Sequence, residues 1–152
     1  MDNKPLILVV NDDGITAPGI SALISFVKEF GEIIVVAPDK AQSGMGHAIT
    51  MNNPLRVNKF DIANTKNAYC CSGTPVDCVK FGKKVLAKGR KVDLVVSGIN
   101  HGLNSSINVV YSGTMSAAIE GSIEESNSVG FSLDNHSFCL LYTSPSPRDP
   151  IG

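Results

Sequence analysis

The sequence predicts an α/β fold with a mostly parallel sheet. Three five-residue runs rich in Val, Ile and Leu, at residues 6–10, 33–37 and 92–96, are typical of strands buried on both faces of such a sheet. A helical pattern lies between the first two runs, and this order of strand, helix and strand predicts a right-handed βαβ unit. A length of 152 residues suffices for one domain with a hydrophobic core.

The first run is followed by a helix that we predict over about residues 17–30. Thr16 or Ala17 is the expected N-cap, and Pro18 suits the first helical turn. Helical spacing gives one apolar stripe, formed by Ile20, Leu23, Ile24, Val27 and Phe30. Gly31 is expected to end this helix before the second run begins.

The middle of the chain is more polar. It predicts, in order, a loop at 38–48, a short exposed strand or hairpin at 49–59, and a turn at 61–67. Thr74, Pro75 and Asp77 then form a helix start, with Thr74 as N-cap and Asp77 as the reciprocal acid of a capping box. The basic segment 83–90 is expected to be a solvated surface.

The third run leads into small and polar residues at 97–104, and Ser112-Gly113-Thr114 precedes a helix that starts at 115–120. Residues 129–133 predict a further strand. We expect one domain over residues 1–137. Residues 138–152 contain three prolines and no periodicity, so we exclude them from the fold as a non-native or disordered tail.

Composition limits the partners. The formal net charge of −1 gives no electrostatic footprint for a nucleic-acid polymer or a membrane surface, and no apolar run has the length of a transmembrane helix. The spacing of the four cysteines fits no zinc pattern. We therefore expect reduced thiols in a cytoplasmic protein.

Two adjacent carboxylates, Asp12 and Asp13, follow the first run. Like charges this close disfavour joint ionisation, and a bound divalent cation would remove that cost. Gly14 allows the bend that brings both acids to one ion. Because ligands of open α/β sheets bind beyond the carboxyl ends of the strands, we interpret the pair as part of a metal site.

Two further strand ends add Ser43 and Asn100 to this edge of the sheet. Carboxylate, hydroxyl and amide oxygens form a hard ligand set that suits Mg²⁺ or Mn²⁺ rather than zinc or copper. The backbone N–H groups and hydroxyls at residues 112–114 precede a helix and can hold an anion. A cation beside an anion site is the minimum for metal-assisted phosphoester hydrolysis.

Five segments in order resemble the SurE family of stationary-phase survival proteins, which are metal-dependent nucleotidases. These segments are residues 9–14, 37–50, 72–79, 97–104 and 111–121. The resemblance extends from about Leu6 to Leu133. It implies a Rossmann-like three-layer fold, and it also implies that the rest of the family domain, with its dimer- and tetramer-forming extension, is missing after about Ser137.

The resemblance implies metal ligands at Asp12, Asp13, Ser43 and Asn100, and phosphate contacts at Ser112, Gly113 and Thr114. It implies hydrolysis of nucleoside 5′- and 3′-monophosphates, with some activity on short polyphosphate, by a homodimer or homotetramer. We expect Asp12 or Asp13 to act as base for the attacking water. His47 is either a proton donor or, in the favoured interpretation, a structural hydrogen-bonder, and Asn11 and Asn104 shape the surroundings of the site.

Two alternatives are weaker. A magnesium-binding receiver domain of a signalling protein also begins with a buried strand ending in paired acids, but it needs an aspartate at the end of its third strand. Here the 49–59 segment is too polar for a buried strand, and the run at 92–96 ends in Ser-Gly-Ile-Asn. A dinucleotide-binding domain needs a glycine fingerprint that the first turn lacks.

Overall fold

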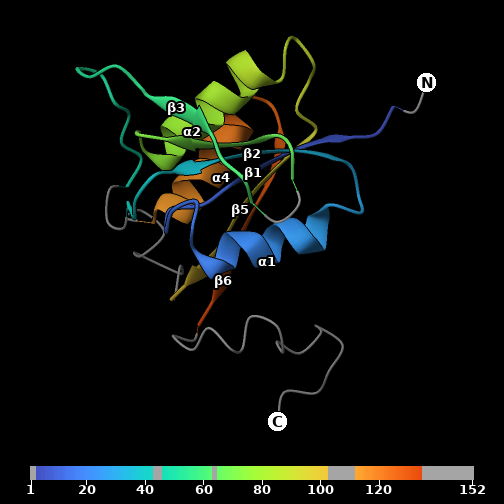
Figure 1. The fold of residues 1–152 in the computed structure, drawn as a ribbon, viewed down its shortest axis with the longest axis horizontal. Helices are drawn as coiled ribbons and strands as arrows, with labels where there is room; N and C mark the ends of the chain where they lie inside the picture. Colours follow the sequence, from blue (N-terminus) through green and yellow to red (C-terminus); the bar gives the residue numbers. More distant parts are fainter. Residues whose placement is uncertain (1–2, 43–45, 63–64, 103–111, 135–152) are drawn as a thin grey trace.

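The computed structural model describes residues 3–42, 46–62, 65–102 and 112–134. The predicted tail at 138–152 lies outside these ranges. Figure 1 shows the arrangement of the elements, which in chain order are β1 (Leu6–Val10), α1 (Pro18–Val27), β2 (Glu32–Pro38), β3 (Val57–Lys59), β4 (Ala68–Cys71), α2 (Pro75–Phe81), the π-helical turn η1 (Gly82–Leu86), β5 (Leu94–His101), α4 (Gly113–Ile123) and β6 (Asn127–Leu133).

The strands form one sheet in the order β3-β4-β2-β1-β5-β6. Every neighbouring pair is parallel except β3 and β4, which are antiparallel. β1 lies at the centre, hydrogen-bonded to β2 on one side and β5 on the other. The predicted α/β fold with a mostly parallel sheet is confirmed.

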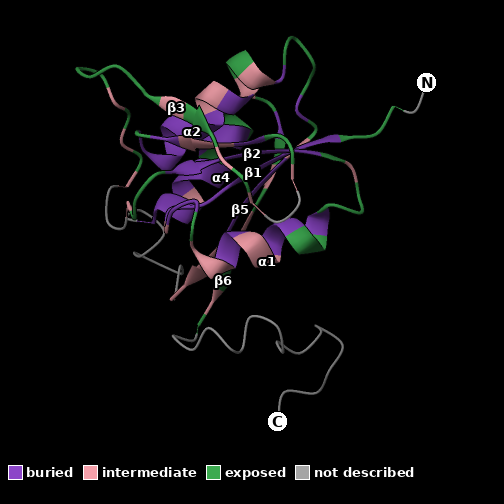
Figure 2. Ribbon diagram, viewed as in Figure 1, coloured by how far each residue is buried: buried purple, intermediate pink, exposed green. Residues whose placement is uncertain are grey.

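The unbroken apolar run of β1 is explained by two hydrophobic cores, one on each face of the sheet. Leu6, Leu8 and Val10 pack on one face with residues of α2 and α4. Ile7 and Val9 point to the other face and pack with the apolar stripe of α1. The layers are therefore helix, sheet and helix, and Figure 2 shows the buried strands between them.

Helix α1 is shorter than predicted. It ends at Val27, with Lys28 as C-cap, and Phe30 is 63% exposed rather than part of the buried stripe. Phe30 instead lies against Phe26 on the surface, with ring centroids 6.2 Å apart. The chain turns early because Gly31 must pass close to the sheet, where an added Cβ would lie 2.3 Å from the Pro5 carbonyl oxygen.

The predicted capping box of α2 is present. The Thr74 hydroxyl accepts a hydrogen bond from the Asp77 amide, and the Asp77 carboxylate accepts one from the Thr74 amide at 2.8 Å. The prediction that 83–90 is only a solvated surface is wrong, because this segment begins inside η1 and Lys83 is tied to α4. The Lys83 ammonium donates to the carbonyl of Glu124 and to the Ser126 hydroxyl.

Two strands differ from the prediction. β4 was not predicted, because its four residues stand between polar segments without a long apolar run. It pairs with the short exposed β3 and with β2, and two of its residues, Ala68 and Cys71, are fully buried. β5 begins two residues later than predicted and continues to His101, so Asn100 lies at the end of a strand rather than in a loop.

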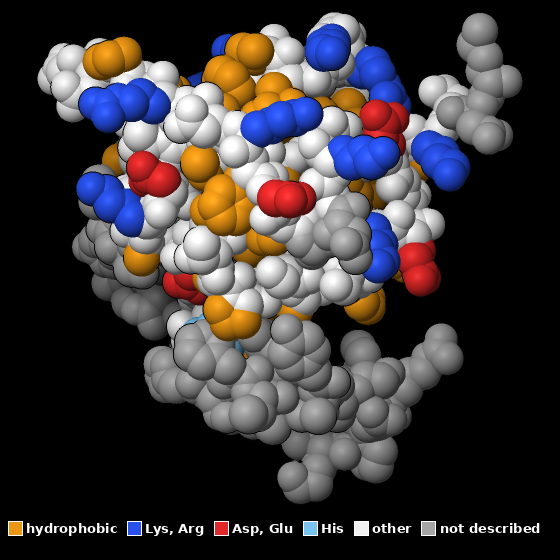
Figure 3. All heavy atoms as spheres, viewed as in Figure 1, with side chains coloured by type: hydrophobic (Ala, Val, Ile, Leu, Met, Phe, Trp, Pro, Cys, Tyr) orange, Lys and Arg blue, Asp and Glu red, His pale blue; other side chains and the backbone are white. Residues whose placement is uncertain are grey.

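The surface matches the near-neutral charge. On the face shown in Figure 3, Lys and Arg side chains are interspersed with Asp and Glu, and hydrophobic groups lie between them. Within the described residues, no helix is long and apolar enough to cross a membrane.

Candidate functional site

The candidate site lies at the carboxyl end of β1, beside the last residues of β5. These strands are parallel neighbours, and Val10 is paired with Ser97. Asp13 and Asn100 each follow that pair by three residues, so both stand just beyond the same point at the carboxyl edge of the sheet. Two of the sequence-predicted elements of the site, the acid pair and Asn100, therefore belong to one edge.

Asp12 is 4% exposed, and its carboxylate faces the start of α4. The Thr114 hydroxyl donates to Asp12 Oδ1 at 2.8 Å, and the Thr114 backbone also hydrogen-bonds this carboxylate. Burial raises the pKa of Asp12 above its usual range, and the hydrogen bonds from Thr114 offset only part of this effect. Asp12 is thus a fixed carboxylate whose negative charge is poorly compensated.

Asp13 is half-buried, and its pKa is raised to about 6. Burial is the main cause and the neighbouring charge of Asp12 is the second, while His101 acts in the opposite direction through its charge and a backbone hydrogen bond. The contact with His101 joins the acid pair to the end of β5. The two carboxylates therefore disfavour each other's ionisation, as their adjacency in the sequence predicts.

The first residues of α4 lie against this acid pair. Ser112 is the N-cap, and its hydroxyl accepts from the Met115 amide at 3.2 Å. Gly113 follows at a very close approach, since a Cβ added there would lie 2.6 Å from the Asp12 Cβ. Three residues predicted to contact phosphate, 112–114, thus form a helix N-terminus beside Asp12, where backbone N–H groups favour anions.

The loop after β2 also lies at this edge of the sheet. The Gln42 amide donates to the Asp12 carbonyl at 2.7 Å, and the Ile15 amide donates to the Pro38 carbonyl at 2.8 Å. Ser43, the predicted ligand from this loop, and Asn104, predicted beyond β5, lie outside the described residues.

The two remaining predicted residues make different contacts. Asn11 is buried, and its amide nitrogen donates to the Gly14 carbonyl at 2.7 Å, which shapes the turn after β1. Its Oδ1 has no hydrogen-bond partner among the described residues. His47 contacts Glu120 of α4, with 2.7 Å between Nε2 and Oε2. Sequence reasoning missed Glu120, because an acid within an otherwise ordinary helical segment gives no signal of its own.

The donor set fits a hard divalent cation. Two carboxylates of raised pKa, with Asn100 at the same edge of the sheet, offer oxygen ligands whose charge suits a divalent cation. Among the described residues, no group of three or more His, Cys, Asp or Glu side chains is placed to hold a metal. The predicted set requires only two such residues, since its other members are Ser43 and Asn100.

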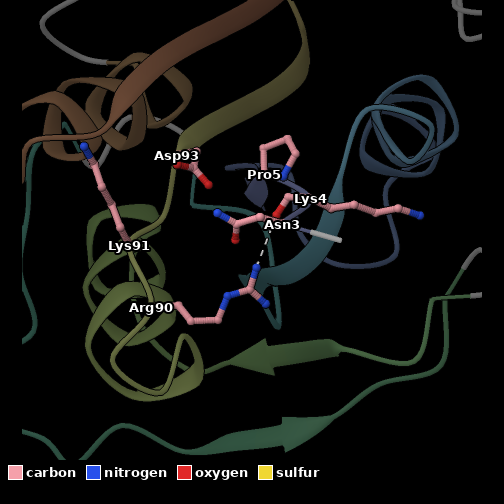
Figure 4. Close-up of a pocket in the computed structure, with 6 residues that line it drawn as sticks. All are labelled: Asn3, Lys4, Pro5, Arg90, Lys91 and Asp93. Carbon is pink, nitrogen blue, oxygen red and sulfur yellow. Dashed lines mark hydrogen bonds between the residues drawn. The ribbon is translucent and has the colours of Figure 1, made fainter. Parts of the chain in front are cut away.

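A separate depression of about 290 Å³ lies at the opposite edge of the sheet, where β1 and β5 begin. Figure 4 shows its lining residues: Asn3, Lys4, Pro5, Arg90, Lys91 and Asp93. The Arg90 guanidinium already pairs with Glu32 at 2.5 Å and with the Lys4 carbonyl, and the Asp93 carboxylate accepts from the Leu6 amide. Arg90 and Asp93 are thus engaged within the fold, and the depression lies at the other end of β1 from the acid pair.

Comparisons with known proteins identify relatives of this chain. Residues 7–146 match the family model described as survival protein SurE. Proteins named 5′-nucleotidase SurE are 63% identical in Cytophaga hutchinsonii, over 86% of this chain and 51% of the relative, and 63% identical in Flavobacterium johnsoniae, over 87% and 51%. A crystal structure of the SurE protein from Aquifex aeolicus superimposes with a TM-score of 0.80 at 40% identity, covering 94% of this chain and 62% of the other. The chain spans about half the length of the curated relatives it matches.

Proposed function

The chain belongs to the SurE family, and from this premise and the site geometry we propose that it supplies the catalytic edge of a metal-dependent phosphomonoesterase acting on nucleoside 5′-monophosphates. The observation that supports the proposal is the contact between Asp12, the buried member of the acid pair, and the N-terminus of α4. Thr114 joins the two by its hydrogen bond to Asp12. A cation site and an anion site are thus neighbours, as phosphate ester hydrolysis requires.

Asp12, Asp13, Ser43 and Asn100 would hold one Mg²⁺ or Mn²⁺. When bound, the cation supplies Lewis-acid polarisation of the phosphate ester and compensates the charge of the acid pair. The relatives named 5′-nucleotidase SurE support the choice of substrate class. We extend the proposal to 3′-monophosphates and short polyphosphate, and to a cytoplasmic homodimer or homotetramer, on the family resemblance alone.

The residues of the chain have separate tasks. Ser112 and Gly113 present backbone N–H groups and the Ser112 hydroxyl to the phosphate. Thr114, the third residue predicted to contact phosphate, fixes the orientation of Asp12 through its hydroxyl and backbone. The attacking water gives its proton to one of the two acids. Asp13 is the better placed base, since Asp12 is more buried and its carboxylate is already engaged by Thr114, whereas Asp13 is half-exposed.

The test is phosphate release from AMP by the 152-residue chain, and by the chain joined to the remaining length of the Cytophaga hutchinsonii relative. We expect release in Mg²⁺ or Mn²⁺, none in excess chelator, and a loss of at least about 100-fold for Asp12→Asn. Asp39→Asn, at an exposed carboxylate after β2, is the matched control and should keep full activity. Undiminished release in chelator, or no release by either protein, contradicts the proposal.

A further inference from the structure

Glu120 is a buried acid that the proposed chemistry does not use. Its side chain is 4% exposed on α4, yet each carboxylate oxygen has its own cationic or hydrogen-bonding partner. The Lys80 ammonium of α2 lies 2.6 Å from Oε1, and His47 Nε2 lies 2.7 Å from Oε2. Burial alone would raise the pKa of Glu120, but the hydrogen bonds from Lys80 and His47 lower it on balance, so the carboxylate is ionised.

An ionised Glu120 requires a proton on Nε2 of the His47 ring. A carboxylate can only accept, so Nε2 must carry the proton and donate it. Nδ1 is then the ring nitrogen that remains for another partner. A buried acid that orients an imidazole in this way is a recurring arrangement in active sites.

His47 also begins a segment that is fastened to α2 beside the site. The Thr74 hydroxyl donates to the Ala48 carbonyl at 2.6 Å. The Thr50 hydroxyl donates to Asp77 Oδ2 at 2.6 Å. Residues 47–50 are thus held at one end by Glu120 and at the other by the capping box of α2.

The capping box in turn adjoins the acid pair. A Cβ added at Gly113 would lie 3.2 Å from the Pro75 ring and 2.6 Å from the Asp12 Cβ. The starts of α2 and α4 therefore meet at Asp12, and the segment 47–50 lies against the start of α2. A displacement of this segment would therefore reach Asp12 through the packed starts of α2 and α4.

Resting on the proposed function, we propose that Glu120 is a positioning residue that acts through His47 and holds the segment 47–50 against the start of α2, beside the site. Lys80 keeps Glu120 ionised and in place. The Lys80 ammonium also pairs with Glu124, whose Oε1 lies 2.9 Å away. Glu124 follows Glu120 by one helical turn. Glu124 therefore provides a matched control that alters the Lys80 ion pairs without removing the partner of His47.

Hydrogen exchange on the metal-free chain is the first test, with Glu120→Gln, Glu120→Ala and Glu124→Gln compared with wild type. We expect exchange at residues 47–50 to become about tenfold faster in both Glu120 variants, with β1 amides unchanged, and to stay at the wild-type rate in Glu124→Gln. No acceleration, equal acceleration in Glu124→Gln, or equal acceleration throughout β1 overturns the proposal. The Gln variant preserves side-chain volume if the Ala variant does not fold.

Phosphate release from AMP by the active form described above is the second test. We expect kcat/KM to fall about tenfold in Glu120→Gln. The double variant Glu120→Gln/His47→Ala should equal His47→Ala within about twofold, because Glu120 acts through that ring. Losses that multiply, or full activity in Glu120→Gln, overturn the proposal. Absence of activity in the wild type refutes the proposed function instead, and hydrogen exchange still decides the role of Glu120.

Discussion

Asp13→Asn is expected to make the metal-free protein more stable at neutral pH while removing a residue of the site. The pKa of Asp13 is about 6 in the folded protein, against a reference value of 3.8. The folded state therefore binds this proton more tightly than the unfolded state. The contribution of this proton to the free energy of unfolding is fully present below about pH 4 and is lost as pH rises through about 6. Asparagine does not titrate, so the variant lacks this loss.

The difference between 3.8 and about 6 corresponds to at most about 3 kcal/mol. Asp13 is half-exposed, and solvent screening reduces the expected gain to about 1–2 kcal/mol. For a chain of 152 residues, this raises Tm by about 2–8 °C. The gain should be full at pH 7.5 and much smaller near pH 4, where the wild-type carboxyl is protonated in the folded state and partly protonated in the unfolded state.

Thermal unfolding followed by circular dichroism, in chelator and between pH 4 and pH 7.5, measures this effect. Asp39→Asn is the control, because its carboxylate is exposed on the loop after β2, and its Tm should follow that of the wild type. Mn²⁺ should then raise the Tm of the wild type more than that of Asp13→Asn. An Asp13→Asn protein that is no more stable than wild type at pH 7.5 would refute the charge conflict at this edge of the sheet.

Three further substitutions test contacts around the acid pair and the helix starts. Gly113→Ala places a Cβ 2.6 Å from the Asp12 Cβ and should lower stability by about 1–3 kcal/mol in urea unfolding and abolish phosphate release, whereas Ser122→Ala, exposed on the same helix, should do neither. Thr114→Val removes the 2.8 Å hydrogen bond to Asp12. It should cost about 1–2 kcal/mol and raise the pKa of Asp12 in an NMR titration, and an unchanged titration would contradict the contact. Thr74→Ala removes the N-cap of α2 and should cost about 1–2 kcal/mol in urea unfolding, so a loss below about 0.3 kcal/mol would contradict its capping role.

The centre of the fold could be predicted because local pattern and tertiary burial agree there. β1 is apolar throughout, and β2 is apolar after Glu32, because both faces of these strands are covered. The Thr74 capping box is a local signal. β4 could not be predicted, since its four residues depend on pairing with β2 and β3. Phe30 fits the helical stripe in sequence, but the close approach of Gly31 to β1 ends the helix first.

In the candidate site, too, some residues could be predicted from the sequence and others could not. Asp12, Asp13 and Asn100 could be placed at one edge because parallel strands end on the same side. The contacts of Glu120 with His47 and Lys80 join residues 73 and 40 positions apart, and no spacing in the sequence indicates such pairs. The basic segment after α2 looked solvated because charge patterns do not reveal that Lys83 reaches the end of α4.

Anomalous diffraction from crystals of the chain grown with Mn²⁺ tests the central claim most directly. The account predicts one strong anomalous peak at the carboxyl ends of β1 and β5, within bonding distance (about 2.0–2.5 Å) of oxygens from Asp12, Asp13 and Asn100. A peak elsewhere would contradict this account. So would the absence of a peak beside Asp12 and Asp13 at a saturating Mn²⁺ concentration.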